Sequence, residues 1–360
     1  MSIQTILSPP LLTADLPGIG GHIKSVPEDF EVEEIPAYEP SGTGEFLHLW
    51  IEKRDMGAEY FVRQVARRLD IAVSEVGTAG MKDRHAVTRQ MVSVPGTVEG
   101  RLAHLEGEGI RVLKVSRHGN KLRPGHLHGN HFSILVRDPL PGGEQILQPL
   151  LYRLRSNGLP NFYGPQRFGH DGETFHLGLA LLRGEKPTPS ATGRVANLRS
   201  PFLRKLSLSA VQSGLFNHYL AERMKAGLLR RVMRGDVMAK VPFGGLFVAE
   251  DVVREQERFD AGETLPAGPI FGRKTFAAAG EAAEREMETL RAFNLSAASF
   301  SGFGKLMQGT RRHNLVALTN LSAAMEAGGV RFSFTLPAGS YATVLLRELM
   351  KTTISEENDG

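Results

Sequence analysis

Residues 77–90, GTAGMKDRHAVTRQ, place one acidic side chain inside a short basic segment. Asp83 stands between Lys82 and Arg84, behind glycines at 77 and 80 that allow a tight loop. Flanking cations favour the ionised form of a carboxylate and let it approach a polyanion. The segment therefore suits an acidic nucleophile that works on nucleic acid. On charge alone, a surface turn with two weak ion pairs is the simpler interpretation.

The composition is that of an ordinary globular chain. Its 360 residues exceed the usual size of one hydrophobic core, so we expect two domains. The absence of cysteine excludes disulfides and thiolate chemistry, and it restricts zinc to histidine and carboxylate ligands. The proline-broken N-terminus does not resemble a signal peptide, and no apolar run approaches the roughly 20 residues that cross a bilayer. We therefore expect a cytosolic protein.

Basic residues are concentrated in two parts of the chain. Residues 111–137 contain no acid, and residues 194–234 contain only Glu222. The first set comprises Arg111, Lys114, Arg117, Lys121, Arg123 and Arg137, and the second comprises Arg194, Arg199, Arg204, Lys205, Arg223, Lys225, Arg230, Arg231 and Arg234. This segregation indicates an electropositive face for a phosphate backbone. Ordinary solvated helices and loops explain it equally well.

Hydrophobic periodicity predicts an α+β fold. Strand patterns occur at 30–35, 46–51, 91–94 and 132–136, and an amphipathic helix is expected at 58–70. No repeated βαβ units appear, so a doubly wound α/β fold is disfavoured.

Helices become more frequent after about residue 156. Helical spacing occurs near 211–220 and 283–293, strand patterns return at 315–318 and 331–336, and Ser340 is expected to cap a closing helix. A middle block inserted between two halves of one strand-rich domain explains this order better than two domains in series.

A second candidate segment, residues 21–30, offers a cation next to an aromatic ring. Lys24 precedes Pro27 and Phe30, and a base stacked on an aromatic ring gains about 1–3 kcal/mol. Taken alone, the segment is explained better as the start of a strand, with Phe30 in the core and Glu28 and Asp29 solvated.

Two other segments carry polar side chains in suggestive patterns. His126, His128 and His131 recur at metal-ligand spacing, but no glutamate is close, so a loop that presents Asn130 to a nucleobase is favoured over a metal site. Residues 158–169 interleave aromatics with amides and an arginine, which suits either RNA contact or the packing of a hinge. Neither a GxSxG sequence nor a Walker-type loop is present, and no glycine-rich dinucleotide fingerprint follows a strand, so serine-hydrolase, nucleotide-hydrolase and dehydrogenase functions lack support.

Six motifs in order along the chain carry a resemblance to a known family. They are KSVPEDFEVEEI, AGMKDRHAVTRQ, GNHFSILVR, PNFYGPQRFG, GTRR and LPAGSYATVLLREL. Together they resemble the TruD family of tRNA pseudouridine synthases over nearly the whole chain. The resemblance implies a pseudouridine-synthase catalytic domain, with a mixed, mainly antiparallel sheet and flanking helices, at residues 1–158 and 313–360. It implies that the family's insertion domain, an α/β domain, interrupts it at 159–312.

The resemblance also implies the activity and the site. The family converts uridine to pseudouridine in tRNA, typically at position 13 of the D arm, without metal or organic cofactor. Asp83 matches its catalytic aspartate and Lys24 its active-site lysine. The implied substrate-binding residues are Phe30, Asn130, Phe132, Tyr341 and Arg84. At Tyr341 the family usually has phenylalanine, and Met81 is not the commonest neighbour of the KDR sequence.

Several alternatives remain open at this point. The aspartate could attack the sugar anomeric carbon or the pyrimidine ring, or could accept a proton. The expected partner is tRNA and the expected state a monomer, with no membrane association. A non-catalytic tRNA-binding protein is the second hypothesis, and a histidine-metal hydrolase is the third.

Overall fold

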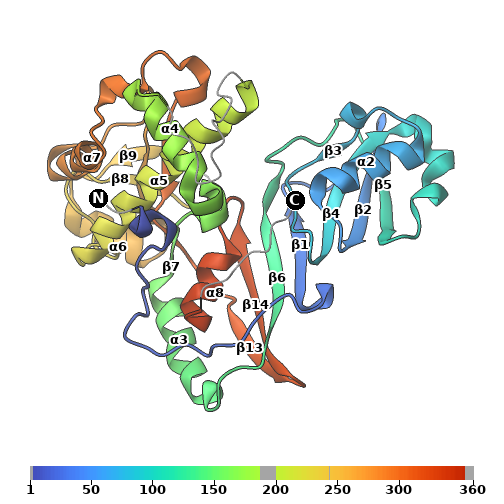
Figure 1. The fold of residues 1–360 in the computed structure, drawn as a ribbon, viewed down its shortest axis with the longest axis horizontal. Helices are drawn as coiled ribbons and strands as arrows, with labels where there is room; N and C mark the ends of the chain where they lie inside the picture. The colour runs from blue at the N-terminus through green and yellow to red at the C-terminus, as the bar shows by residue number, and fades with distance from the viewer. Residues whose placement is uncertain (1–2, 187–199, 243, 353–360) are drawn as a thin grey trace. The chain divides into compact units, whose positions relative to one another are not determined.

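The computed structural model describes residues 3–186, 200–242 and 244–352, which form two compact units (Figure 1). We call the first the helical unit and the second the sheet unit. The helical unit comprises Met1–Ala14, Ser156–Ala317 and Thr343–Leu345, and the sheet unit comprises Asp15–Arg155, Leu318–Ala342 and Leu346–Gly360. Each is described by itself below.

The sheet unit is built on one eight-stranded sheet. Its strand order is β13-β14-β6-β1-β4-β2-β5, and the short strand β3 also pairs with β4. The strands are β1 (Phe30–Pro36), β2 (Phe46–Arg54), β3 (Gly77–Thr78), β4 (Val87–Pro95), β5 (Ile110–His118), β6 (Leu127–Arg137), β13 (Ser322–Glu326) and β14 (Gly329–Pro337). Only the β1–β4 pairing is parallel, so the sheet is mixed but mainly antiparallel.

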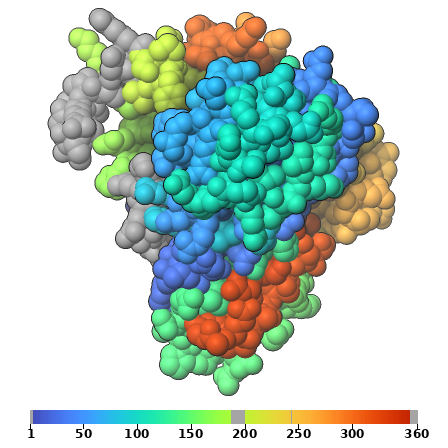
Figure 2. All heavy atoms as spheres, turned by 90° about the vertical axis from the view of Figure 1, so that its right-hand side faces the viewer, coloured from blue at the N-terminus to red at the C-terminus, as the bar shows by residue number. Residues whose placement is uncertain are grey.

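Short helices accompany this sheet. They are η1 (Pro27–Asp29), α2 (Ala58–Leu69), η2 (Val73–Glu75), η3 (Gly96–Leu105) and α3 (Gly143–Asn157). Helix α8 (Ala342–Met350) follows β14, and its residues Thr343–Leu345 are grouped with the helical unit. The apolar face of α2, with Phe61 and Val65, packs in one cluster with Leu47 and Leu49 of β2. Strand β5 closes one edge of the sheet, and its turquoise atoms lie open in Figure 2.

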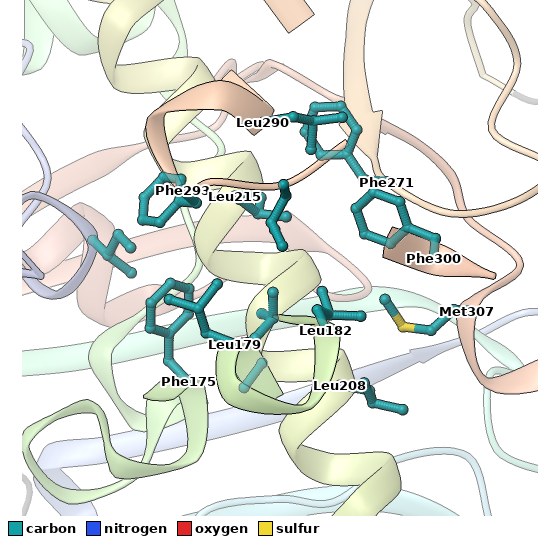
Figure 3. Close-up of a cluster of buried hydrophobic side chains, with 14 of the residues drawn as sticks. Phe175, Leu179, Leu182, Leu208, Leu215, Phe271, Leu290, Phe293, Phe300 and Met307 are labelled. Carbon is teal, nitrogen blue, oxygen red and sulfur yellow. The ribbon is translucent and has the colours of Figure 1, made fainter. Parts of the chain in front are cut away.

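The helical unit has its own hydrophobic core (Figure 3). Phe175 and Leu179 of α4, Leu208 and Leu215 of α5 and Leu290 of α7 belong to it. Its elements are α1 (Gln4–Leu7), β7 (Leu159–Pro160), η4 (Pro165–Phe168), η5 (His170–Gly172), α4 (Glu173–Arg183), α5 (Pro201–Lys225), β8 (Val237–Lys240), β9 (Leu246–Val248), α6 (Val252–Asp260), β10 (Thr264–Ile270), α7 (Gly280–Ala292), η6 (Ala297–Phe300), η7 (Gly304–Met307), β11 (Thr310–His313) and β12 (Leu315–Val316).

The close approach of α4 to α5 depends on a glycine. A Cβ added at Gly178 would lie 2.1 Å from the carbonyl oxygen of Ser207, so the two helices would have to move apart. We expect Gly178→Ala to lower the free energy of unfolding by about 1–3 kcal/mol, as overpacking does. In Gly100→Ala the new methyl group meets no atom within 4 Å, so urea denaturation should show little loss there. Equal destabilisation of both variants would contradict this account.

The α+β class predicted from the sequence is confirmed. Strands β4 and β6 extend further than their apolar patterns indicated, because polar residues such as Thr88 and Gln90 are also buried in the sheet. The cap prediction was wrong. Tyr341, not Ser340, occupies the N-cap of α8, and it makes no side-chain capping hydrogen bond. Within the residues described here, no helix is long and apolar enough to cross a membrane.

Candidate active site

The Asp83 carboxylate pairs with the Lys24 ammonium within the sheet unit. Lys24 Nζ donates a hydrogen bond to Asp83 Oδ1 over 3.1 Å. Both side chains are partly open to solvent, with 21% of Lys24 and 37% of Asp83 exposed. Lys24 has φ 63°, in the left-handed region that non-glycine residues rarely adopt. A strained backbone therefore holds the lysine that faces a reachable carboxylate, a pattern common at functional sites.

Three phenylalanine rings pack next to the Lys24 side chain. Lys24 Nζ sits 4.5 Å from the centre of the Phe30 ring, a cation–π distance. Phe30 meets Phe132 edge-on with ring centres 6.3 Å apart, and Phe132 stacks on Phe334 at 5.2 Å. Phe30 and Phe132 are only 2% and 6% exposed. Phe30 is thus a core residue, as the simpler interpretation of its segment expected, and its ring also contacts the Lys24 ammonium.

The loop that carries Asp83, residues 79–86, is fastened to the sheet by two buried lysines; we call it the Asp83 loop. Lys82 Nζ contacts Glu34 Oε2 at 2.7 Å, with both side chains almost fully buried. Glu34 Oε1 also accepts the backbone N–H of Met91. Lys82 therefore does not serve as an exposed cation flanking Asp83. Its ammonium pairs instead with Glu34 of β1 and so holds the loop against that strand.

The second fastening comes from Lys53, which sequence analysis missed. Lys53 Nζ donates to the carbonyl oxygen of Asp83 over 2.8 Å and to that of Met56, and its side chain is fully buried. The available signal was its place in β2, where it follows buried Leu49 and Ile51 at two-residue spacing. A lysine that continues the apolar face of a strand must find partners inside the protein.

The acidic residue next to Phe30 is buried and paired with an arginine. Asp29 is 1% exposed and accepts two hydrogen bonds from Arg137, at 2.7 and 2.8 Å, and one from the Val26 N–H. Burial by itself would raise the pKa of Asp29, but the bonds from Arg137 and Val26 lower it below its usual value. Only Glu28 fits the expectation of solvated acids here, in an exposed pair with Arg54.

Asn130 lies on the face of the sheet that also carries Phe132. It pairs in register with Glu34 on β1 and Leu336 on β14, two residues before Phe132. Residues two apart on a strand share a face. Within the part of the chain that the structure describes, its buried Oδ1 has no hydrogen-bond partner. A ligand with an N–H group would satisfy this oxygen.

The other expected substrate contacts lie in the same unit. Arg84 directly follows Asp83 and is exposed. Tyr341 is half-buried and stands between β14 and α8.

The histidines of the third segment are engaged in separate contacts. His126 Nδ1 pairs with the Tyr38 hydroxyl at 2.9 Å, whereas His131 contacts Thr335 and Ser333. Among the described residues, no group of three histidine or carboxylate side chains is arranged to hold a metal ion.

The segment 158–169 lies in the helical unit and packs tightly. Arg312 lies 4.1 Å over the Tyr163 ring and donates to Asn161 Oδ1 at 2.6 Å. Phe162 and Phe168 are fully buried. The cation and the aromatic are therefore paired with each other inside this unit.

The predicted electropositive face is smaller than the sequence indicated. Arg223 is buried in an ion pair with Asp236, and Arg137 is used by Asp29. Arg194 and Arg199 lie outside the described residues, as does the acidic C-terminal tail.

Comparison with known proteins identifies the family. The family model described as tRNA pseudouridine synthase D (TruD) matches residues 8–192 and 188–349. The chain is 46% identical to tRNA pseudouridine synthase D of Anaeromyxobacter dehalogenans, with 95% of this chain and 96% of the relative covered. It is 43% identical to the protein of that name in Thermus thermophilus, over 95% of this chain and 92% of the relative.

A solved structure supports the same relationship. The putative tRNA pseudouridine synthase D of Methanosarcina mazei superposes with a TM-score of 0.79 at 25% identity, covering 97% of each chain. These matches make the chain an isomerase of the pseudouridine synthase class. Within that class it belongs to the tRNA pseudouridine synthase D (TruD) family, which confirms the resemblance noted in its motifs.

Proposed function

We propose that this chain converts uridine to pseudouridine in tRNA, at position 13 of the D arm, with Asp83 as the nucleophile. The observation that carries the proposal is the Lys24–Asp83 pair, at 3.1 Å and open to solvent. A structural ion pair has no need of a loop fastened by two buried lysines. A nucleophile does, because its oxygen must meet the reacting atom within a few tenths of an ångström.

The target uridine must leave the RNA stack to reach this carboxylate. Base flipping costs a few kcal/mol, which contacts to the extruded base can repay. Asn130 suits the edge of uracil, because its unpartnered Oδ1 can accept the N3–H of the ring. Phe132 underlies the same face, and Arg84 is placed to contact a phosphate beside Asp83. Tyr341 would add a hydroxyl near the base.

The reaction is an isomerisation, so its atoms balance without water or redox partner. In one route, an Asp83 oxygen bonds to the sugar anomeric carbon while the glycosidic bond breaks and its electron pair goes to uracil N1. The uracil then rotates, its C5 bonds to the anomeric carbon while the bond to the carboxylate oxygen breaks, and C5 loses its proton as N1 gains one. Attack on the pyrimidine ring and proton abstraction are the other two routes. In each, Lys24 stabilises the charged carboxylate before attack.

The domain assignment belongs to the same proposal. Residues 1–158 and 313–360 form the pseudouridine-synthase domain, and residues 159–312 form an insertion domain. The chain passes between the compact units at Arg155 and Ser156 and again at Ala317 and Leu318, close to these bounds, which supports the assignment. Two short segments, Met1–Ala14 and Thr343–Leu345, are grouped with the helical unit instead. tRNA is the proposed partner, a monomer the proposed state, and neither metal nor organic cofactor takes part.

The test is to incubate the protein with an unmodified tRNA transcript and map pseudouridine with a chemical probe specific for it. We expect one new pseudouridine, at position 13. A non-catalytic tRNA-binding protein would retain the RNA in a salt-dependent complex yet form no pseudouridine. Pseudouridine at another position would support the proposed activity but would overturn the assignment of position 13.

A further inference from the structure

A pocket lies beside the Asp83 loop, within the sheet unit. Its volume of about 320 Å³ falls at the small end of ligand sites. Its walls come from the start of α2, from Val73 and from the residues around Gly80 and Met81, while Gln90 of β4 also lines it. Pocket and candidate active site therefore share one loop.

Gln90 gives this pocket a polar group without a partner. The side chain is 2% exposed, and no donor among the described residues lies within hydrogen-bond distance of its Oε1. A buried acceptor left unpaired costs free energy, so native proteins rarely keep one without a reason. A ligand donor that reached this oxygen would remove that cost.

The walls of the pocket are apolar and unusually open to solvent. Met81 is 84% exposed and Val73 is 52% exposed, while Val62 lines the pocket from α2. Large apolar side chains that stay exposed around a cavity commonly mark a binding site. Flat aromatic rings suit such a site, since they bury both faces against aliphatic groups.

The rim of the pocket suits a nucleic-acid backbone. Arg63 lines it and forms a long, exposed ion pair with Glu59, at 3.8 Å. Helix α2 begins at the pocket, and the N-terminal end of a helix favours an anion such as a phosphate.

The pocket is separate from the place of the reacting base. Over the part of the chain that the structure describes, Lys24, Asp83 and Asn130 do not line it. Between Met81 and Asp83 stands Lys82, whose ammonium turns down to Glu34 on the sheet. In the Asp83 loop, Asp83 thus carries the carboxylate proposed to react, and Met81, two residues earlier, forms part of the pocket wall.

We propose that this pocket binds a second, unstacked nucleobase of the RNA substrate, one whose exocyclic amino group donates to Gln90 Oε1. Adenine, guanine and cytosine carry such a group, whereas uracil does not. Occupation of the pocket would press on Met81 and so couple recognition of this base to the position of Asp83. The inference rests on the proposed function and deepens it, because it names a specificity contact for the same reaction.

The test is an abasic scan of a tRNA transcript, read by equilibrium binding. We expect one position other than the target at which loss of the base weakens binding about tenfold. In Met81→Ala the same abasic change should weaken binding clearly less, because the wall that holds the base is gone. Gln90→Leu should lose the preference for an amino-bearing base over uracil at that position. Val115→Ala, at an exposed valine of β5, is the matched control and should keep the full abasic penalty.

The proposal is overturned if no such position exists, or if Met81→Ala keeps the whole penalty. Because the readout is binding, it is independent of the pseudouridine assay. If the protein makes pseudouridine but Met81→Ala keeps the abasic penalty, the proposed function stands and the second base site is refuted. If Met81→Ala reduces the penalty but no pseudouridine forms, the second base site stands and the proposed function is refuted.

Discussion

Asp83→Asn should lower the rate of pseudouridine formation by about 10³-fold or more, since an amide cannot replace a carboxylate nucleophile. The substitution preserves shape and the contact with Lys24, while the loop keeps its fastening through the Asp83 carbonyl oxygen. Affinity for tRNA should therefore change little. The measurements are single-turnover conversion of a tRNA transcript and a binding titration with the same RNA.

Asp70→Asn provides a matched control. Asp70 lies in the same unit, its side chain is 96% exposed, and its φ of 53° suits asparagine. Its activity should equal that of the unmodified protein. Near-normal turnover by Asp83→Asn would refute the nucleophile assignment, and loss of binding by that variant would show that the carboxylate serves recognition instead.

Lys53→Met should have the second largest effect. The change removes the donor to two carbonyl oxygens, that of Met56 in a buried bond and that of Asp83 in a partly buried one. Leaving such groups unpaired costs about 1–3 kcal/mol each, although removing a buried charge offsets part of this, so we expect a net loss of about 2 kcal/mol. Catalysis should suffer more, since a displaced reacting group can lose about 100-fold in rate.

The measurements that separate these effects are urea denaturation, kcat and tRNA affinity. A purely structural role for Lys53 predicts lower stability with unchanged kcat in the folded fraction. A positioning role predicts that kcat falls while affinity for tRNA stays constant. Lys305→Met, at an exposed lysine of the helical unit, should alter none of the three.

Much of the sheet could be predicted because its pattern is local. Alternation of Phe30 and Val32, and of Phe132 and Ile134, marks strands whose inner faces are apolar, and these strands are present. The amphipathic helix expected at 58–70 is α2, which ends one residue earlier. Prediction was weaker where buried positions are polar, as at Thr88 and Gln90, because burial there is set by neighbouring strands.

In the candidate active site, too, some residues could be predicted from the sequence and others could not. The motifs indicate Asp83, Lys24 and Asn130 from the sequence, since each stands in a segment with several specified neighbours. The roles of Lys82 and Lys53 were not accessible in this way. Lys82 is distant in sequence from Glu34, and Lys53 from Asp83. The two pairs come together only when the strands assemble into the sheet.

By itself, the order of residues determined the family and the α+β class and indicated the carboxylate that we propose as the nucleophile, because these depend on short motifs and on the period of apolar side chains. Only the tertiary structure decided which charges face solvent and which hold the Asp83 loop in place. The physical reason is desolvation: a lysine removed from water must find oxygen atoms nearby, and strands distant in sequence supply them.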